Sequence, residues 1–336
     1  MCPLLPLLSV VASAAGIDTE RPQPDLPASA AGYLSVKVEN DMFTSGNDRH
    51  FTHGLKAGWV SERCQLGWVG PLARLLGLTA LDERGCGGAR VGLGVGQAIY
   101  TPVNLNWSEP DPRDRPYAGW LYLAGSLYAE THRDEGALRD RALVRFELSL
   151  GVVGPASGAS EMQRAWHQLV GAPRPRGWRN QLQNEAAVMF TWEYLRRFGR
   201  RLGRYLELDV TPAAGLSLGN VFSQATVGMT IRVGHDMAGD WGPERGFFEA
   251  PGSGFSWYLF AGTELRGVAH DVFLDGNTYV DGPRVDKRPF VADARFGLAV
   301  CLSRVRLTYT MVLRSPQFSG QRQLDDFGAL GLTAGW

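Results

Sequence analysis

The chain has 336 residues, in which 34 acidic side chains balance 34 basic ones. This balance predicts no nucleic-acid partner and no acidic tail. Hydrophobic residues form 44% of the chain and are interrupted by 42 glycines, so the sequence is too apolar for a disordered protein and too broken for membrane-spanning helices. A β-barrel of this length commonly forms a single unit.

The first residues have the pattern of a secretory signal. Leu4 to Ala15 is a short apolar stretch that ends in the small-residue cleavage site Ala12-Ser13-Ala14, although the usual positive region in front of it is missing. A stretch this short cannot span a bilayer. We therefore expect a signal peptide (1–14), a periplasmic N-terminal lead (15–32) and an outer-membrane β-barrel (33–336).

Export would place the cysteines in an oxidising compartment. There Cys64 and Cys86 can close a disulfide across one connection between strands. The spacing of the cysteines matches no zinc motif.

Beyond the lead, apolar and polar residues alternate. In the segment 34–39 the even positions are apolar and the odd positions polar or charged, and the same alternation recurs at 144–150, 206–210 and 305–314. Charges of both signs alternate with apolar residues over segments of about ten residues, which is typical of lipid-facing and lumen-facing rows in a transmembrane barrel. A secreted β-sandwich is the alternative.

Roughly twelve strands are expected, the even number that bacterial single-chain barrels require. They lie near 33–40, 51–61, 90–99, 117–130, 142–152, 185–196, 203–214, 223–234, 254–268, 289–302, 304–315 and 325–336. The terminal aromatic Trp336 resembles the assembly signal of outer-membrane proteins. The predicted fold is an all-β, antiparallel transmembrane barrel.

One convincing helix interrupts the strands, starting at Ser160 and ending before Gly171 and Pro173. Ser160 followed by Gln163 predicts a capping box. An apolar stripe recurs along the helix at helical spacing (Met162, Trp166, Leu169, Val170). Gln163 and His167, four residues apart, share a neighbouring face.

The topology predicts where this helix lies. With both termini in the periplasm, the first, third and fifth connections emerge on the outer face. These connections lie at 39–54, 96–120 and 154–185, and they hold the least generic residues of the chain. Asn40, Asp41 and His167 are therefore expected at one mouth of the barrel.

Asn40 and Asp41 supply an amide oxygen and a carboxylate where a strand leaves the barrel. Hard cations such as Ca²⁺ prefer oxygen ligands of this kind, but Asn and Asp are also common in ordinary turns. A histidine near a bound cation suits hydrolysis: His167 would take a proton from water while the metal polarises an ester carbonyl.

Two competing motifs are weaker. Gly215 to Gly219 matches the Gly-x-Ser-x-Gly elbow around Ser217, but strands rather than a helix are expected on both sides. His50 and His53 with Asp48 suggest a transition-metal site, yet strict alternation would place His50 and His53 on opposite faces of a strand.

Several segments together resemble the outer-membrane lipid A 3'-O-deacylases, the LpxR family. The resemblance rests on Glu39-Asn40-Asp41, Asp48 to Gly54, Ile99 to Pro102, Asp114 to Gly119, Gln163 to Gly171 and Trp178 to Glu185, and it covers most of the chain in order. It implies a twelve-stranded barrel with its site between the barrel wall and a loop helix on the outer face.

The resemblance also implies a chemistry. Members of the family remove the 3'-linked acyloxyacyl group of lipid A and use calcium. By resemblance His167 is the general base, Asp41 and Asn40 are calcium or oxyanion residues, and Thr52 is a further site residue on the second strand.

The chain departs from the family in its third connection. A lysine associated there with phosphate binding has no evident counterpart, and Asn104 to Trp107 occupies the region. Arg113 or Arg115 is a hypothetical replacement. Asp114 and Arg115 are alternatively expected to form an ion pair that orders the mouth.

The expected function is calcium-dependent hydrolysis of lipid A, whose acyl chains stay in the outer leaflet and reach the site laterally. The expected partners are lipopolysaccharide and outer-membrane lipid, and the chain is expected to be a monomer in the outer membrane of a Gram-negative cell. One alternative is a barrel phospholipase with Ser217 or another mouth serine as nucleophile. Another is a non-enzymatic pore or scaffold, which would keep its function after His167→Ala.

Overall fold

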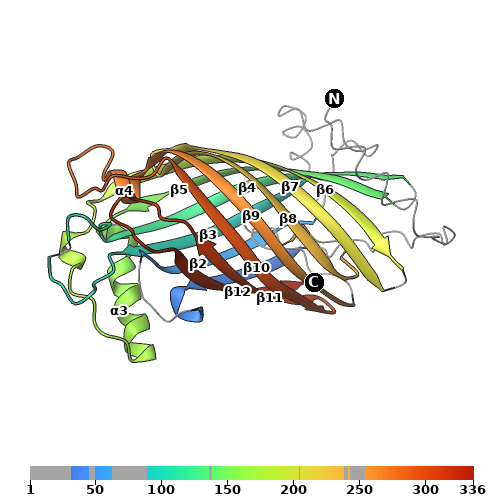
Figure 1. Cartoon of the computed structure of the whole chain (residues 1–336), viewed down its shortest axis with the longest axis horizontal. Coiled ribbons are helices and arrows are strands. Elements are labelled where there is room, and N and C mark those ends of the chain that lie inside the picture. The colour runs from blue at the N-terminus through green and yellow to red at the C-terminus, as the bar shows by residue number, and fades with distance from the viewer. Residues whose placement is uncertain are drawn as a thin grey trace.

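The computed structural model describes residues 32–44, 50–62, 89–109, 111–135, 138–203, 205–237, 241–242 and 254–336. Within these ranges twelve antiparallel strands form one closed barrel, in which β1 pairs with both β2 and β12 (Figure 1). The predicted barrel and its strand number are confirmed. The expected signal peptide, Asp48 and the Cys64–Cys86 disulfide lie outside the described residues.

The strand bounds follow the predicted segments closely. The strands are β1 Tyr33–Asn40, β2 His50–Val60, β3 Arg90–Thr101, β4 Ala118–Glu135, β5 Leu138–Val153, β6 Glu185–Leu202, β7 Leu206–Gly219, β8 Phe222–His235, β9 Phe255–Asp271, β10 Phe290–Leu302, β11 Val305–Arg314 and β12 Asp325–Gly335. The helices are η1 Asp41–Phe43, η2 Pro155–Ser157, α3 Ala159–Val170, η3 Trp178–Asn180 and α4 Val272–Asp275. None of the described helices is long and apolar enough to cross a membrane.

The alternation in sequence sorts side chains between the two faces of the wall. On β1, Leu34 and Val36 are exposed on the outside, whereas Lys37 and Glu39 line a cavity inside the barrel. Residues paired directly across neighbouring antiparallel strands lie on the same face of a sheet. Val36 is paired with Ala57, so the apolar outer surface continues from strand to strand, as expected of the lipid-facing belt of a transmembrane barrel.

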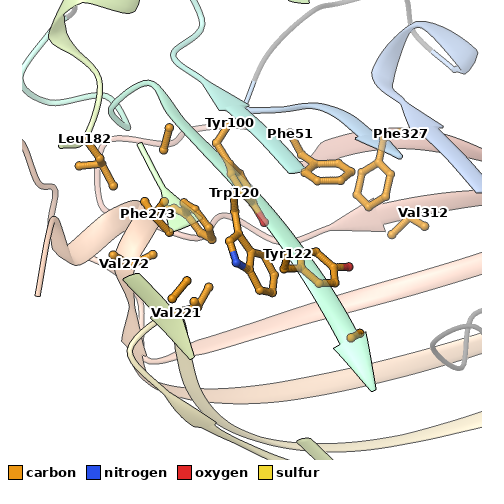
Figure 2. Packing of buried hydrophobic residues seen from close by; sticks show 14 of the residues in the cluster. Phe51, Tyr100, Trp120, Tyr122, Leu182, Val221, Val272, Phe273, Val312 and Phe327 are labelled. Carbon is orange, nitrogen blue, oxygen red and sulfur yellow. The ribbon is translucent and has the colours of Figure 1, made fainter. Parts of the chain in front are cut away.

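The lumen is filled by aromatic side chains near the end at which α4 lies (Figure 2). Tyr100 stacks on Phe273 and Trp120 stacks on Tyr122, each with ring centroids 4.1 Å apart. Phe273 belongs to α4, which begins where the Asp271 carboxylate accepts a hydrogen bond from the Phe273 N–H at 2.9 Å. This aromatic layer anchors α4 inside the mouth of the barrel.

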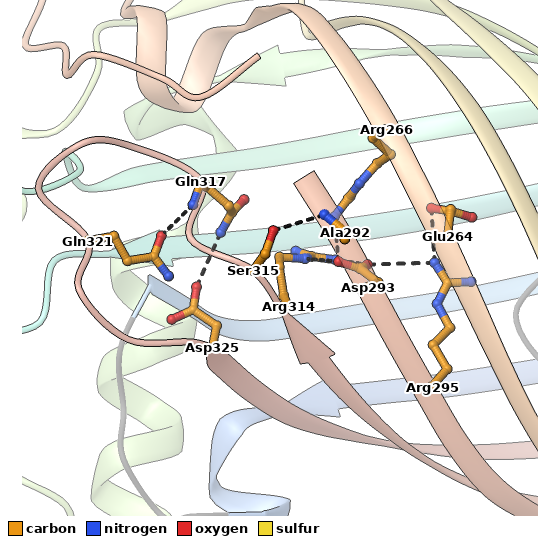
Figure 3. A network of polar contacts seen from close by, with 10 residues as sticks. All are labelled: Glu264, Arg266, Ala292, Asp293, Arg295, Arg314, Ser315, Gln317, Gln321 and Asp325. Atoms are coloured by element: carbon orange, nitrogen blue, oxygen red, sulfur yellow. Dashed lines mark hydrogen bonds and ion pairs between the residues drawn. The ribbon is translucent and has the colours of Figure 1, made fainter. Parts of the chain in front are cut away.

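A polar network lies on strands β9 to β12 (Figure 3). The Asp293 carboxylate accepts hydrogen bonds from Arg266 at 2.8 Å and from Arg314 at 3.0 Å, while Arg295 forms an ion pair with Glu264 at 3.1 Å. Each buried charge thus has an opposite charge beside it, as the cost of removing it from water requires. These residues border a lumenal cavity of about 310 Å³, which Ser217 lines and which Asn40, Asp41 and His167 do not.

Candidate active site between the barrel wall and α3

The helix α3 packs against the outer surface of the wall. Asn40, His53, Ile99 and Gly119 are paired in turn across β1 to β4, and we call these four residues the site row. On the same face of β3 and β4, farther from the mouth, Leu93 and Leu123 are exposed. The site row therefore lies on the lipid side of the wall rather than in the lumen.

Close contacts hold the start of α3 on this row. A Cβ added to Gly119 would meet the Cβ of Ala159 and the hydroxyl of Ser157, so glycine is needed for the helix to approach. Ile99 is buried together with Ala159 and Trp178. The arrangement expected for the site, a loop helix packed against the barrel wall, is therefore present at β1 to β4 and α3.

The helix exists as predicted, but the predicted capping box is wrong. The N-cap residue is Gly158, at φ 68°, and it makes no side-chain cap hydrogen bond. Ser160 lies inside the first turn and donates its hydroxyl to Glu161 at 2.8 Å. Gly171, at φ 71°, ends the helix as expected.

The face of α3 with Gln163 and His167, rather than its apolar stripe, is turned toward the protein. Its buried residues are Ala159, Gln163 and His167, whereas Met162 and Leu169 of the apolar stripe are 36% and 77% exposed. The polar row is turned inward because residues that follow the helix supply it with hydrogen-bond partners.

His167 is one of these inward side chains. Its Nδ1 lies 2.6 Å from the carbonyl oxygen of Pro173. A carbonyl oxygen can only accept, so in the neutral imidazole Nδ1 carries the proton and Nε2 keeps its lone pair. Nε2 is therefore the nitrogen able to accept a proton.

Gln163 lies four residues before His167 on the same buried face. Its Oε1 accepts a hydrogen bond from Trp178 Nε1 at 2.7 Å, which fixes the orientation of the amide. Its Nε2 is buried and makes no hydrogen bond within the part of the chain that the structure describes. From the sequence, Gln163 was expected only as the partner of Ser160 in a capping box, although its spacing of four residues from His167 already placed both side chains on one face of the helix.

Asn40 and Asp41 lie where β1 ends, and both are buried. The Asn40 side-chain oxygen accepts the Met42 N–H at 2.8 Å and so caps η1. Asn40 thus makes a contact typical of turns, and the Asp41 side chain is buried beside the site row.

A ring contact joins this strand end to α3. His53, paired with Asn40, has its ring 5.6 Å from that of Trp166, the neighbour of His167 in α3. Thr52 lies in β2, between Phe51 and His53, where the pairing with β3 shifts register. Bulges of this kind are common beside active sites.

The two histidines of β2 do not converge on a metal. His50 lies 2.5 Å from Asp325 through Nδ1 and 3.6 Å from Asp114 through Nε2, whereas His53 meets Trp166. No group of three His, Cys, Asp or Glu side chains that could hold a metal occurs among the described residues.

The arginines of the third connection differ from expectation. Arg115 is fully buried with its guanidinium 4.6 Å from the centre of the Tyr100 ring, and burial lowers its pKa. Only its backbone N–H reaches Asp114, so the expected side-chain ion pair is wrong. This burial argues against a head-group contact through Arg115. Arg113 is exposed, and its hydrogen bonds lower the pKa of Asp111 to about 2.

Ser217 does not occupy a nucleophile elbow. The segment from Gly215 to Gly219 lies wholly within β7. The Ser217 hydroxyl lines the lumenal cavity and is 3.3 Å from the hydroxyl of Thr191. The sharp strand-to-helix turn that the motif needs is absent from this described segment.

Comparison with known families settles the relationship. A family model described as outer membrane protein LpxR matches residues 3–336. The chain belongs to the LpxR family. Its placement in the outer membrane follows from this membership and from the closed barrel with its apolar outer belt.

A solved structure shows the same fold. LpxR from Salmonella typhimurium matches with a TM-score of 0.70 and 20% sequence identity, over 90% of this chain and 100% of that one. The transport unit of the autotransporter AIDA-I from Escherichia coli covers 98% of this chain and 97% of its own at 9% identity, but its TM-score of 0.41 is too low to argue from. No curated protein matches the sequence.

Proposed function

We propose that this LpxR-family barrel is a lipid A 3'-O-deacylase that hydrolyses the ester of the 3'-acyloxyacyl chain. The observation that carries the proposal is the buried His167, whose Nδ1 is tied to the Pro173 carbonyl on the lipid side of the barrel wall. A histidine held in this way presents Nε2 as a base, and its position beside the lipid-facing surface suits an ester in the outer leaflet.

The reaction needs one water molecule. His167 Nε2 takes a proton from the water as its oxygen bonds to the ester carbonyl carbon. The bond from that carbon to the sugar 3'-oxygen then breaks, and His167 returns the proton to this oxygen. The products are an acyloxyacyl carboxylic acid and lipid A with a free 3'-hydroxyl, so atoms balance.

The Gln163 amide is placed to assist. Because Trp178 holds the oxygen of the amide, its buried N–H₂ is directed away from Trp178 and is available as a donor to the developing oxyanion. Donors fixed before the reaction stabilise a transition state without the cost of reorganising.

The residues fit calcium only as a partial shell. Asp41 offers a buried carboxylate and Asn40 an amide oxygen, while no larger cluster of acidic or histidine side chains gathers among the described residues. Ca²⁺ takes six to eight oxygen ligands, so backbone carbonyls, water and substrate would supply the rest. Bound there, the cation would add positive charge for the oxyanion.

Mass spectrometry of purified lipid A after incubation with the refolded barrel tests the proposal. We expect loss of one acyloxyacyl mass in calcium, no loss in chelator, and no loss with His167→Ala. His235→Ala, which changes a histidine at the opposite end of the barrel, is the matched control and should remain active. An unchanged spectrum for the wild-type protein under all conditions would refute the reaction.

The serine phospholipase is the second candidate and is tested in parallel. Ser217→Ala should leave activity unchanged, since Ser217 lies in the lumen within β7. Loss of activity on phospholipid in this variant, together with a calcium-independent reaction, would favour that candidate instead.

A further inference from the structure

We propose that one flank of α3 is immersed in the outer leaflet and holds the cleft of the site against the acyl region of the membrane. The occupant is lipid, a mixed surface of acyl chains and head groups. The inference rests on the outer-membrane placement of the barrel and deepens the proposed function by assigning how the site meets its substrate.

The first observation is the division of α3 into three faces. Ala159, Gln163 and His167 face the wall. At helical spacing Met162, Trp166 and Leu169 share a second flank, which carries no charge. Glu161, Arg164 and Gln168 share the remaining one, on which Arg164 forms an ion pair with Glu161 at 2.6 Å.

The second observation fixes which flank faces away from the membrane. The segment that follows α3 packs on the His167 side, where Pro173 accepts from His167 and Trp178 donates to Gln163. That segment is tied to the outer-face connection between β3 and β4, because the Trp178 ring lies 5.0 Å from that of Tyr117. At helical spacing His167 is the wall-facing residue nearest to Arg164, so the flank that carries Arg164 is the outer side.

The apolar flank lies on the opposite side, toward the belt. Trp166 on this flank meets His53 of the site row. Successive residues on one face of a strand are about 7 Å apart. One step below His53 and Asn40 the outward residues are Leu55 and Val38, and the next step reaches the exposed Val36.

This surface is continuous with an interface already described. The helix α3 contacts β3 and β4, which carry part of the lipid-facing belt. It runs across the long axis of the barrel rather than along it (Figure 1). An amphipathic helix in this orientation lies in the plane of the membrane interface with its apolar side in the acyl boundary. Leu169, 77% exposed in the protein alone, gains an apolar environment there.

A fluorescence experiment tests the immersion without using catalysis. The full barrel, with its native cysteines replaced by alanine, carries the fluorophore NBD on Leu169→Cys or on the adjacent Gln168→Cys, and is reconstituted in phosphatidylethanolamine and phosphatidylglycerol vesicles. We expect blue-shifted emission and strong quenching by doxyl-labelled lipid at 169 but not at 168. Equal, water-like emission at both positions would overturn the inference.

A second measurement covers the effect on turnover. Leu169→Asp should lower the rate on lipid A in vesicles about tenfold relative to Gln168→Asp, and both variants should match the wild type on lipid A dispersed in detergent. Equal rates of the two variants in vesicles would refute the role in substrate access. An inactive wild-type protein with NBD quenched at 169 would refute the proposed reaction while leaving the immersion supported.

Discussion

Gly119→Ala is the sharpest test of the idea that α3 completes the site on the outside of the wall. The added Cβ would fall on the Ala159 Cβ and the Ser157 hydroxyl, well inside the roughly 3.5 Å at which carbon atoms make a favourable contact. Strand β4 is hydrogen-bonded to β3 on one side and to β5 on the other, so it cannot move easily. The helix α3 must therefore move away from the wall by about 1 Å or more. A misplacement of about 1 Å at a catalytic group costs about 100-fold in rate.

The assay is kcat/KM on lipid A in vesicles, read by mass spectrometry of the products. Gly125→Ala is a matched control on the same strand and face, because a Cβ at Gly125 meets nothing within 4 Å. Both variants should keep the heat-dependent gel mobility of a folded barrel. We expect a loss of about 100-fold for Gly119→Ala and none for Gly125→Ala.

The double variant Gly119→Ala with Ala159→Gly tests the same contact from the side of the helix. Removing the Ala159 methyl group relieves one of the two contacts, so part of the lost rate should return. Full activity of Gly119→Ala alone would show that α3 does not need its observed position, and the wall–helix site would then be wrong.

Three further predictions concern the site and the lumen. Gln163→Leu should lower kcat about 100-fold with little change in KM if the amide donates to the oxyanion, and an effect on KM alone would contradict that role. Asp41→Asn should raise the calcium concentration for half-maximal rate about tenfold, as measured by titration from a chelator-treated sample; an unchanged requirement would remove Asp41 from the cation site. Asp209→Asn should destabilise the barrel by about 3 kcal/mol, because it leaves Arg232 buried without the carboxylate that it now contacts at 2.6 and 2.9 Å; Glu161→Gln, on an exposed pair, should change the urea midpoint little.

The strands could be predicted from the sequence because each carries its own evidence. A row such as Leu34 to Glu39 shows the alternation within a few residues, and lipid on one side and charges on the other leave no second arrangement. Twelve such segments fix a closed barrel, and the closure then decides which connections share the outer mouth.

The orientation of α3 could not be predicted in this way. A stripe of Met162, Trp166 and Leu169 normally marks a buried face. In α3 the polar side chains of Gln163 and His167 are buried instead, because Trp178 and Pro173 supply their hydrogen-bond partners. Those partners come from a segment whose path depends on the barrel wall. A helix beside a membrane can place its apolar face either against the protein or in lipid, and the sequence pattern alone does not distinguish these two arrangements.

The register shift at Thr52 has a consequence for how the protein tolerates change. By simple alternation Phe51 and His53 would share a face, but Phe51 packs in the lumen against Tyr100 and Phe327, while His53 faces α3 outside. Thr52 is the one residue of β2 without a partner in β3, and Phe51 and His53 follow their partners Tyr100 and Ile99 onto opposite faces. Tyr100 and Ile99 are consecutive in β3, so deletion of Thr52 would give an uninterrupted ladder that leaves Phe51 inside and His53 outside. The extra residue therefore changes the local path of the backbone beside the site rather than the faces of its neighbours.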